Sequence, residues 1–396
     1  ADYAEGLDPG LDVELIHLAE APEEILAAER VIGEIPPVLP TDPDRPVCVC
    51  FTSGSTGEPK AAWYANRQLR AIAELDAGGA WGGGGHRYAS TEFAPVGVMT
   101  KLPWLLATGG TTHLLEKWRA EAVLELIDHY RMASVSAIAP QVALMLRVPD
   151  LDRFDFSCVK AIVTGGALAS PGLVRAGREL FGAPWSIRYS STESGGVGLA
   201  TALDAPDGEA LHTVGRPRPG VEAEIRDEQG NIVPAGEVGE LWLRSDAVMS
   251  GYWNDPVATA ATLVGGWLRT GDLALVDDRG CYRLAGRVKE MFIRGGYNVY
   301  PLEVERVLST HPKVAHVALV PRADEVMGEI GVAVVVPVDA GDVPSLDELR
   351  AHAEVELAAY KLPEALRLVE ELPVNATDKI DRHVLAAVEE REAAAR

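Results

Sequence analysis

Stretches of this chain with strand-like apolar runs are followed by stretches whose apolar positions have helical spacing. This pattern predicts that strands and helices alternate along the chain. Short apolar runs typical of buried strands occur at 46–51, 133–139, 159–163 and 185–189. Helical spacing is found between them at 66–75, 120–130, 142–146 and 171–180. Alternation of this kind with short connections predicts a parallel sheet with helices on its faces, so we expect an α/β fold. Ligands of such sheets bind beyond the carboxyl ends of the strands.

The pattern changes to β at about residue 215, and again near residue 289. Clean period-two alternation covers 221–226 and 239–244, and a hairpin-like segment follows to about residue 290. Beyond Lys289 the chain has a mixed pattern of its own, with helices at 302–308 and 346–360 and strands at 314–320 and 332–338. We therefore expect an N-terminal domain of mixed sheets with a small β-subdomain at 1–288, and a small α+β domain at 289–396. The first residues predict a weak strand at 13–18 and a helix at 21–31.

The net charge and the cysteines indicate which kinds of partner and which cellular compartment to expect. The 36 basic and 59 acidic residues leave a net charge of −23, which repels nucleic acid and anionic membranes. The apolar runs are too short to span a bilayer. Cys48 and Cys50 alternate on one strand and face the same side, and the four cysteines have no zinc spacing. We expect free thiols in a soluble, cytoplasmic protein with no nucleic-acid or membrane partner.

A loop rich in hydroxyl groups and glycine follows the first strand. Its sequence is Phe-Thr-Ser-Gly-Ser-Thr-Gly-Glu-Pro-Lys, from residue 51 to residue 60. The glycines let backbone N–H groups turn toward an anion, the hydroxyls donate hydrogen bonds, and the lysine adds a positive charge. A flexible, solvated turn is the alternative. The phosphate-binding candidates are Thr52, Ser53, Gly54, Ser55, Thr56, Gly57 and Lys60.

Two later turns also come directly after predicted strands. Thr164-Gly165-Gly166-Ala167 would let a flat ligand approach the backbone, or would serve as a tight turn. Tyr189-Ser190-Ser191-Thr192-Glu193 combines an aromatic face, hydroxyls and a carboxylate, the set that can stack a base, contact a phosphate and hold a hard cation. Farther along, Asp272 and Arg287 are suited to gripping ribose hydroxyls, with an ordinary surface ion pair as the alternative.

Together these motifs resemble the adenylate-forming superfamily, which includes acyl-CoA and aryl-CoA synthetases, the adenylation domains of peptide synthetases and firefly luciferase. The resemblance spans nearly the whole chain in the family's order. It implies a large N-terminal portion, a hinge at Lys289 and a small mobile C-terminal domain. The motifs are those at 52–60 and 189–193, Ser250-Gly251-Tyr252-Trp253, Thr270-Gly271-Asp272, the segment 286–305 and Lys379.

The resemblance also implies a role for individual residues. Thr192 and Glu193 correspond to the α-phosphate and Mg²⁺ contacts, and Lys379 to the lysine that bridges the acid and the α-phosphate. The Gly295-Gly296 turn is similar to the place where pantetheine passes in CoA ligases. The implied adenine and ribose contacts are Gly165, Gly166, Ala167, Tyr189, Ser190, Asp272 and Arg287.

The chemistry that these parts imply is the activation of a carboxylic acid with ATP and Mg²⁺. A carboxylate is a poor nucleophile facing an anionic triphosphate, so the site must neutralise charge and hold the attack in line. Loss of pyrophosphate leaves an acyl-adenylate, which the thiol of coenzyme A can attack. Loading of a carrier protein and an inactive nucleotide-binding remnant are the alternatives. A homodimer is an open question at this point.

The sequence departs from the family's pattern in ways that bear on the substrate. Ala94 stands where peptide-synthetase domains place the aspartate that binds an α-amino group, which favours an apolar aryl or acyl acid. Ala61 and Asp378 occupy positions where the family usually has glycine. About fifty residues precede the phosphate loop, fewer than is usual in the family, so we expect that a subdomain is missing, disordered or supplied separately. The substrate-pocket candidates are Phe93, Ala94, Val98, Gly195 and Gly196.

Overall fold

A computed structural model describes residues 40–52, 59–77, 82–90, 95–115, 117–166, 169–374 and 380–394. Pro43–Arg396 forms one unit of the chain and Ala1–Asp42 another. The strand and helix expected at 13–18 and 21–31 lie outside the described residues. In the described part, no helix is long and apolar enough to cross a membrane.

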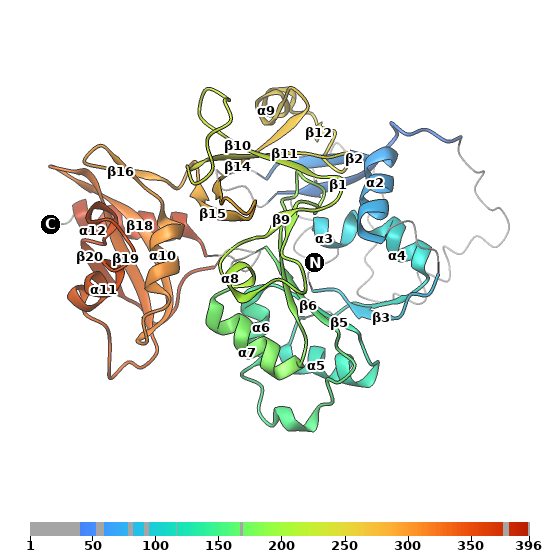
Figure 1. Cartoon of the computed structure of the whole chain (residues 1–396), viewed down its shortest axis with the longest axis horizontal. Helices are drawn as coiled ribbons and strands as arrows, with labels where there is room; N and C mark the ends of the chain where they lie inside the picture. The colour runs from blue at the N-terminus through green and yellow to red at the C-terminus, as the bar shows by residue number, and fades with distance from the viewer. Residues whose placement is uncertain are drawn as a thin grey trace, which may run out of the picture. The chain divides into compact units, whose positions relative to one another are not determined.

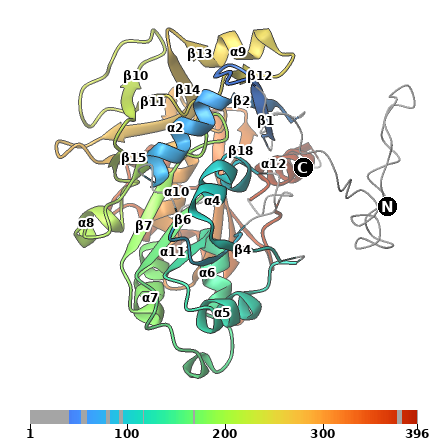
Figure 2. The ribbon, with the colours of Figure 1, turned by 90° about the vertical axis from the view of Figure 1, so that its right-hand side faces the viewer.

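The central sheet carries the predicted alternation of parallel strands and helices. Three parallel strands stand side by side in the order β5-β6-β7, and β8 and β9 extend the sheet antiparallel. Helices α5, α6 and α7 lie together beside these strands in both views (Figure 1, Figure 2). The strands are β5 (Ser134–Ala137), β6 (Ala161–Gly165), β7 (Trp185–Tyr189), β8 (Leu199–Ala200) and β9 (Arg216–Pro217), and the helices are α5 (Ala120–His129), α6 (Ala139–Met145) and α7 (Pro171–Phe181).

Strand β7 shows how local sequence sets which face is buried. Trp185 is fully buried against α7, where a Cβ on Gly177 would lie 2.3 Å from the indole, and its Nε1 donates to Thr164 Oγ1 at 2.8 Å. Helix α7 begins with an N-cap, since the Ser170 hydroxyl accepts from the Leu173 N–H at 3.2 Å. Along β7 every side chain is buried except that of Arg188, which is exposed.

A second region contains antiparallel sheets, as the change of pattern near residue 215 predicts. One sheet has the order β10-β11-β14-β13, with β15 paired to β14, and another has the order β1-β2-β12. Its strands are β1 (Pro46–Phe51), β2 (Ala61–Ala65), β10 (Glu222–Arg226), β11 (Gly239–Arg244), β12 (Gly251–Tyr252), β13 (Leu263–Val264), β14 (Trp267–Val276) and β15 (Tyr282–Arg287). The other elements before residue 288 are α2 (Asn66–Ala77), β3 (His86–Tyr88), α3 (Val96–Met99), α4 (Leu102–Thr108), β4 (Thr111–His113), η1 (Leu151–Arg153), α8 (Asp207–Ala210) and α9 (Pro256–Thr262).

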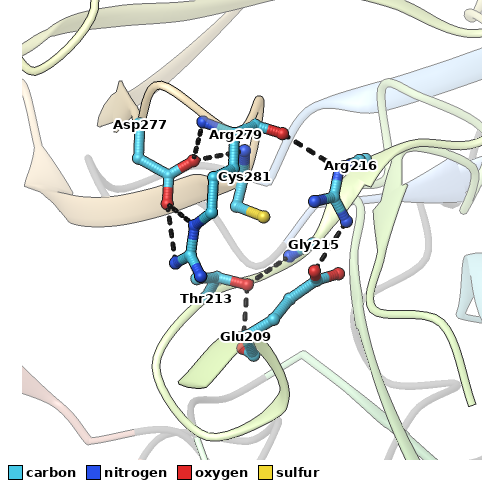
Figure 3. Close-up of polar contacts among 7 residues, drawn as sticks. All are labelled: Glu209, Thr213, Gly215, Arg216, Asp277, Arg279 and Cys281. Carbon is cyan, nitrogen blue, oxygen red and sulfur yellow. Dashed lines mark hydrogen bonds and ion pairs between the residues drawn. The ribbon is translucent and has the colours of Figure 1, made fainter. Parts of the chain in front are cut away.

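A network of polar contacts ties the β14–β15 hairpin to the central sheet (Figure 3). Arg216 donates to Glu209 Oε2 at 2.6 Å and to the carbonyl of Arg279 at 3.3 Å. Asp277 accepts the N–H groups of Arg279 and Cys281 at 3.0 and 2.8 Å, which closes the hairpin turn. Because Arg216 belongs to β9, this network holds the hairpin against the sheet that carries β7.

The described residues from Phe292 onward are built around a long β-hairpin. Val317 and Leu319 of β18 face a core that includes α10 and α11, while Ala318 and Val320 face Leu385 of α12. Because successive side chains of a strand point to opposite faces, the continuous buried runs of β18 and β19 allow a helix layer on each face. The elements are β16 (Phe292–Arg294), β17 (Tyr297–Val299), α10 (Pro301–Leu308), β18 (Val314–Asp324), β19 (Gly328–Pro337), α11 (Leu346–Ala353), η2 (Ala359–Lys361), β20 (Ala365–Leu368) and α12 (Arg382–Ala394).

Some predicted bounds were wrong. The helix expected at 346–360 ends at Ala353, because the chain returns over it: Arg350 donates to the Pro363 carbonyl at 2.6 Å, and Ala358 has left the helical region at ψ 146°. Strand β6 begins two residues later than expected, since the Val159 N–H is used in a turn with the Phe156 carbonyl.

Candidate active site

The two ends of the predicted phosphate loop meet in the structure. The Thr52 N–H donates to the Lys60 carbonyl at 2.8 Å, and the Lys60 N–H donates to Thr52 Oγ1 at 3.2 Å. Lys60 Nζ lies 5.0 Å from the ring centroid of Tyr252. The loop between them therefore starts and ends at one point beside β12. Ser53, Gly54, Ser55, Thr56 and Gly57 lie outside the described residues.

Glu193 is held in place by the strand that carries the Ser250–Trp253 motif. The Tyr252 hydroxyl donates to Glu193 Oε1 at 2.8 Å, and the Met249 N–H donates to the Glu193 carbonyl at 2.9 Å. Burial raises the pKa of Tyr252, and the charge of Glu193 and the hydrogen bond to it raise it further. The phenol is therefore a proton donor at neutral pH. The Tyr64 hydroxyl contacts the carbonyl of Thr192 in the same turn.

The turn after β7 is fixed by its own hydroxyls and glycines. The Ser191 N–H donates to Ser194 Oγ at 2.9 Å, and the Ser194 N–H donates to Ser191 Oγ at 3.2 Å. Gly195 has a φ of 72°, and a Cβ there would lie 2.4 Å from the Ala247 carbonyl, so only glycine fits. These contacts fix the backbone of the turn that carries Thr192 and Glu193.

Three residues that the sequence analysis assigned to the nucleoside form one hydrogen-bonded chain. Asp272 and Arg287 are register partners on β14 and β15, and Arg287 Nε donates to Asp272 Oδ1 at 3.1 Å. The Tyr189 hydroxyl donates to Asp272 Oδ2 at 2.5 Å. Burial raises the pKa of Asp272, and the attraction of Arg287 and the Tyr189 hydrogen bond offset this only in part. The structure thus brings the expected ion pair and Tyr189 together.

The glycines after β6 lie next to the same strand end. Gly165 is the register partner of Arg188 on β7, and a Cβ on Gly165 would lie 3.0 Å from the Arg188 carbonyl. Gly166 has a φ of 74°, which favours glycine. Ser190 follows Tyr189 directly at the end of β7, whereas Ala167 lies outside the described residues.

The described substrate-pocket candidates come together around the turn after β7. Val98 is buried on α3, and the Thr100 hydroxyl donates to the Gly195 carbonyl at 3.3 Å. A Cβ on Gly196 would lie 3.6 Å from Lys101 Nζ. Phe93 and Ala94 lie outside the described residues, so the prediction from Ala94 stays a prediction.

A group of charged residues next to Gly196 was missed by the sequence analysis. Asp76, at the end of α2, forms ion pairs with Lys101 and, at 2.8 Å, with Arg218. Burial lowers the pKa of Arg188, repulsion from Arg218 lowers it further, and the attraction of Asp76 opposes both effects. Burial also lowers the pKa of Lys101, and the charge of Arg188 contributes to this lowering. We call these four residues the Asp76 cluster. They come from separate elements with no shared motif, so nothing local in the sequence indicates them.

The expected CoA turn and hinge lie beyond β15. Gly295 and Gly296 form the β16–β17 turn with φ values of 55° and 88°, and the Gly295 N–H donates to the Met327 carbonyl at 2.8 Å. Lys289 is exposed between β15 and β16. Lys379 lies outside the described residues.

Comparison with known proteins gives the family. The model of the AMP-binding enzyme family matches residues 5–253, and that of the AMP-binding enzyme C-terminal domain matches residues 303–379. The chain therefore belongs to the AMP-binding enzyme family, within the adenylate-forming superfamily that the motifs resemble.

Individual relatives are similar over most of the chain. An indoleacetate–CoA ligase from Aromatoleum aromaticum is 33% identical over 93% of this chain and 73% of its own length. A fatty acid–[acyl-carrier-protein] ligase from Streptomyces coeruleorubidus is 33% identical over 87% of this chain and 67% of its own length.

A solved structure of the amide bond synthetase McbA from Marinactinospora thermotolerans is 37% identical with a TM-score of 0.78, covering 85% of this chain and 68% of that one. The o-succinylbenzoate CoA synthetase of Bacillus subtilis, solved with an acyl-adenylate intermediate, is 27% identical with a TM-score of 0.74, covering 85% of this chain and 68% of that one. These likenesses agree with the expected fold class.

Proposed function

We propose that this chain activates a carboxylic acid with ATP to an acyl-adenylate and then transfers the acyl group to the thiol of coenzyme A. The observation that carries the proposal is the hydrogen-bonded chain Tyr189–Asp272–Arg287, which lies at the end of β7 beside the turn that bears Glu193. A nucleoside bound there would place its phosphates toward that turn. The names of the relatives, which are CoA ligases and other acid-activating enzymes, support the same chemistry.

The nucleoside half of the site would work by hydrogen bonding. One Asp272 oxygen faces Arg287 and the other faces Tyr189, and the remaining acceptor capacity of the carboxylate can take the ribose hydroxyls. The Tyr189 ring and the backbone at Gly165 and Gly166 would enclose the adenine. Holding the nucleoside in this way positions the α-phosphate for attack by the acid.

The phosphate half of the site would work by charge. Lys60 and the hydroxyl-rich loop would bind the outer phosphates, while Thr192 and Lys379 would contact the α-phosphate and the attacking carboxylate. Removing water from these groups strengthens their attraction for the charge that develops as pyrophosphate leaves. We propose these roles on the basis of the motif resemblance and the convergence of Lys60, Tyr252 and Glu193.

Glu193 fits the Mg²⁺ that such a reaction uses. One of its oxygens accepts from Tyr252, and the second has no hydrogen-bond partner among the described residues, so an anionic oxygen is available. In that part of the chain no three His, Cys, Asp or Glu residues form a metal cluster. Mg²⁺ usually binds one or two carboxylates together with substrate phosphates and water, and Glu193 would supply one such carboxylate. When bound, the ion would neutralise phosphate charge.

We further propose that residues 1–288 and 289–396 act as two domains with Lys289 as the hinge. The described residues from Phe292 onward have hydrophobic cores of their own, and the C-terminal family model begins at residue 303. Thiol transfer would use the Gly295-Gly296 turn. We propose the cytoplasm as the compartment, because the four cysteines are free.

ATP–pyrophosphate exchange across a panel of aryl, branched and linear carboxylic acids tests the first half-reaction. Exchange with at least one acid is expected, and absence of exchange with all of them would favour an inactive remnant.

Adding CoA or a phosphopantetheinylated carrier protein to the preformed acyl-adenylate tests the second half-reaction. The acyl-carrier-protein ligase among the relatives makes carrier loading the second candidate, and thioester on the carrier but not on CoA would establish it. Sedimentation of the same preparation distinguishes a monomer from a homodimer.

A further inference from the structure

Arg382, the first residue of α12, binds two carboxylates at once. Its terminal nitrogens donate to the two oxygens of Glu305 at 2.6 and 2.7 Å, the parallel arrangement that makes a strong ion pair. Its Nε lies 3.2 Å from Glu290 Oε2, and Nη1 also donates to the Leu319 carbonyl at 3.1 Å. Burial lowers the pKa of Arg382, but the attraction of Glu305 and Glu290 outweighs this effect and the net pKa is raised. The guanidinium is therefore charged and joined to α10, to β18 and to the turn after β15.

The start of α12 is also where the chain returns from residues 375–379. Val374 and Ile380 form an antiparallel bridge on either side of this segment. The N–H that follows Ile380 donates to the carbonyl that precedes Val374 at 2.8 Å. Lys379, to which we assign the α-phosphate, is the neighbour of Ile380 and precedes Arg382 by three residues. The contacts of Arg382 therefore hold the backbone from which the proposed phosphate-binding lysine extends.

Glu290 connects these contacts to the nucleoside site. It directly follows the proposed hinge at Lys289, and its N–H donates to the Arg287 carbonyl at 3.1 Å. Glu290 Oε1 lies 3.9 Å from Arg287 Nη1, and Arg287 Nε donates to Asp272 Oδ1 at 3.1 Å. Charges of alternating sign therefore lead from the proposed ribose contacts to the start of α12: Asp272, Arg287, Glu290, Arg382 and Glu305.

A second ionic group holds α12 farther along and does not involve Arg382. Glu389 is 2% exposed and forms ion pairs with Arg367 of β20 and, at 3.6 Å, with Arg322 of β18. Between the two groups, Leu385 packs in a small core with residues of β18 and β19. The helix is thus secured to its own sheet by these contacts. The ion pairs of Arg382 add a fixed position for the start of the helix relative to the turn after β15.

We propose that Arg382 is a positioning residue for adenylation, which fixes the place of Lys379 relative to the nucleoside through its ion pairs with Glu290 and Glu305. This inference rests on the proposed function and adds a residue to it. All three guanidinium nitrogens have protein partners, so Arg382 would act through the lysine and not on the substrate itself. An ammonium acts on a phosphate as a point charge, and a misplacement of about 1 Å can slow a reaction by about 100-fold.

The test separates the two half-reactions in variants of Arg382. ATP–pyrophosphate exchange is measured with an acid that the wild type activates, and thioester formation is measured from supplied acyl-adenylate and CoA. Arg382→Met should lower the kcat of exchange by about 10- to 100-fold and change the KM for ATP by less than about threefold, because the ribose contacts remain. Thioester formation should stay close to the wild-type rate. Arg382→Lys should be intermediate, because it keeps the charge and loses the two parallel hydrogen bonds.

A double-mutant cycle distinguishes positioning from a general loss of stability. If Arg382 acts through Lys379, Arg382→Met should cost almost nothing further in exchange when it is added to Lys379→Ala. Costs of the two substitutions that multiply would overturn the inference and leave the proposed function intact. Arg367→Met is the matched control, because it removes an ion pair at the far end of the same helix. It should lower the melting temperature and leave the kcat of exchange unchanged.

Glu290→Gln decides the question if Arg382→Met does not fold, because the pair between Arg382 and Glu305 remains in that variant. It removes one partly exposed ion pair and should lower the kcat of exchange by about two- to fivefold. This loss should disappear in the Lys379→Ala background. A Glu290→Gln variant with no loss, or with the same loss in both backgrounds, would overturn the inference. Absence of exchange in the wild type with every acid would overturn the proposed function as well.

Discussion

Asp272→Asn should separate the function of the nucleoside site from the stability of the fold. Burial raises the pKa of Asp272 above its ordinary value despite Arg287 and Tyr189. An acid whose pKa is higher in the folded state than in the unfolded state lowers stability as the pH rises through these values, because the folded state then holds the charged form at a cost. At neutral pH the carboxylate is therefore a cost to folding, which suggests that it is kept for binding.

The magnitude follows from the contacts. Asparagine keeps the shape of the side chain and an oxygen that can accept from the Tyr189 hydroxyl or from Arg287 Nε, so little packing is lost. The melting temperature should stay the same or rise slightly. A ribose hydroxyl would lose a hydrogen bond to a charged acceptor, worth about 1.5–3 kcal/mol, which lowers kcat/KM for ATP by about 10- to 150-fold.

The assay pairs the variant with nucleotides that lack a ribose hydroxyl. ATP–pyrophosphate exchange is measured with ATP, 2′-deoxy-ATP and 3′-deoxy-ATP for both proteins, and thermal melts are recorded in parallel. Wild type should lose activity with at least one deoxynucleotide, while Asp272→Asn should lose little more with that nucleotide, because the bond is already gone.

Asp277→Asn is the matched control, since this carboxylate lies on the same hairpin and accepts backbone N–H groups instead. Hydrogen bonding to the Cys281 N–H lowers the pKa of Asp277, so the charged form favours folding. This variant should lower the melting temperature and leave the KM for ATP unchanged. The reasoning would be refuted if Asp272→Asn unfolded the protein or if its deficit with each deoxynucleotide matched that of the wild type.

Three further predictions concern the phosphate half and the sheet. Glu193→Gln keeps an acceptor for Tyr252 but loses the charge, so adenylation should slow and need more Mg²⁺ with an unchanged melt, and unaltered magnesium dependence in exchange assays would contradict the assignment. Lys379→Ala should lose about 3 kcal/mol of transition-state stabilisation in adenylation and should still convert supplied acyl-adenylate to thioester at the normal rate. Equal loss of both steps in single-turnover assays would indicate a structural role for the lysine. Trp185→Ala should lower the free energy of unfolding by about 3–5 kcal/mol in denaturant titrations, because the indole fills the space beside Gly177. A loss below about 1 kcal/mol would mean that the neighbouring side chains close the cavity.

Much of the local structure followed from the sequence. The predicted bounds of β1, β7 and β11 are those observed, and α7 begins at its predicted proline. Each is set by side chains within a few residues of one another, through the period of apolar positions or through a cap. The motifs after β6 and β7 were placed at strand ends for the same reason. Asp272 and Arg287 could be linked before the structure because they lie on one hairpin.

Only the tertiary structure decided which motifs touch. The Tyr252–Glu193 and Tyr189–Asp272 hydrogen bonds join residues 59 and 83 positions apart, and the Asp76–Arg218 ion pair spans 142. Such pairs depend on how loops close and sheets stack, which periodicity does not encode. The early end of α11 has the same origin, since the returning chain at Pro363 determines it. Local spacing therefore revealed the parts of the site, and the packing of distant elements brought those parts together.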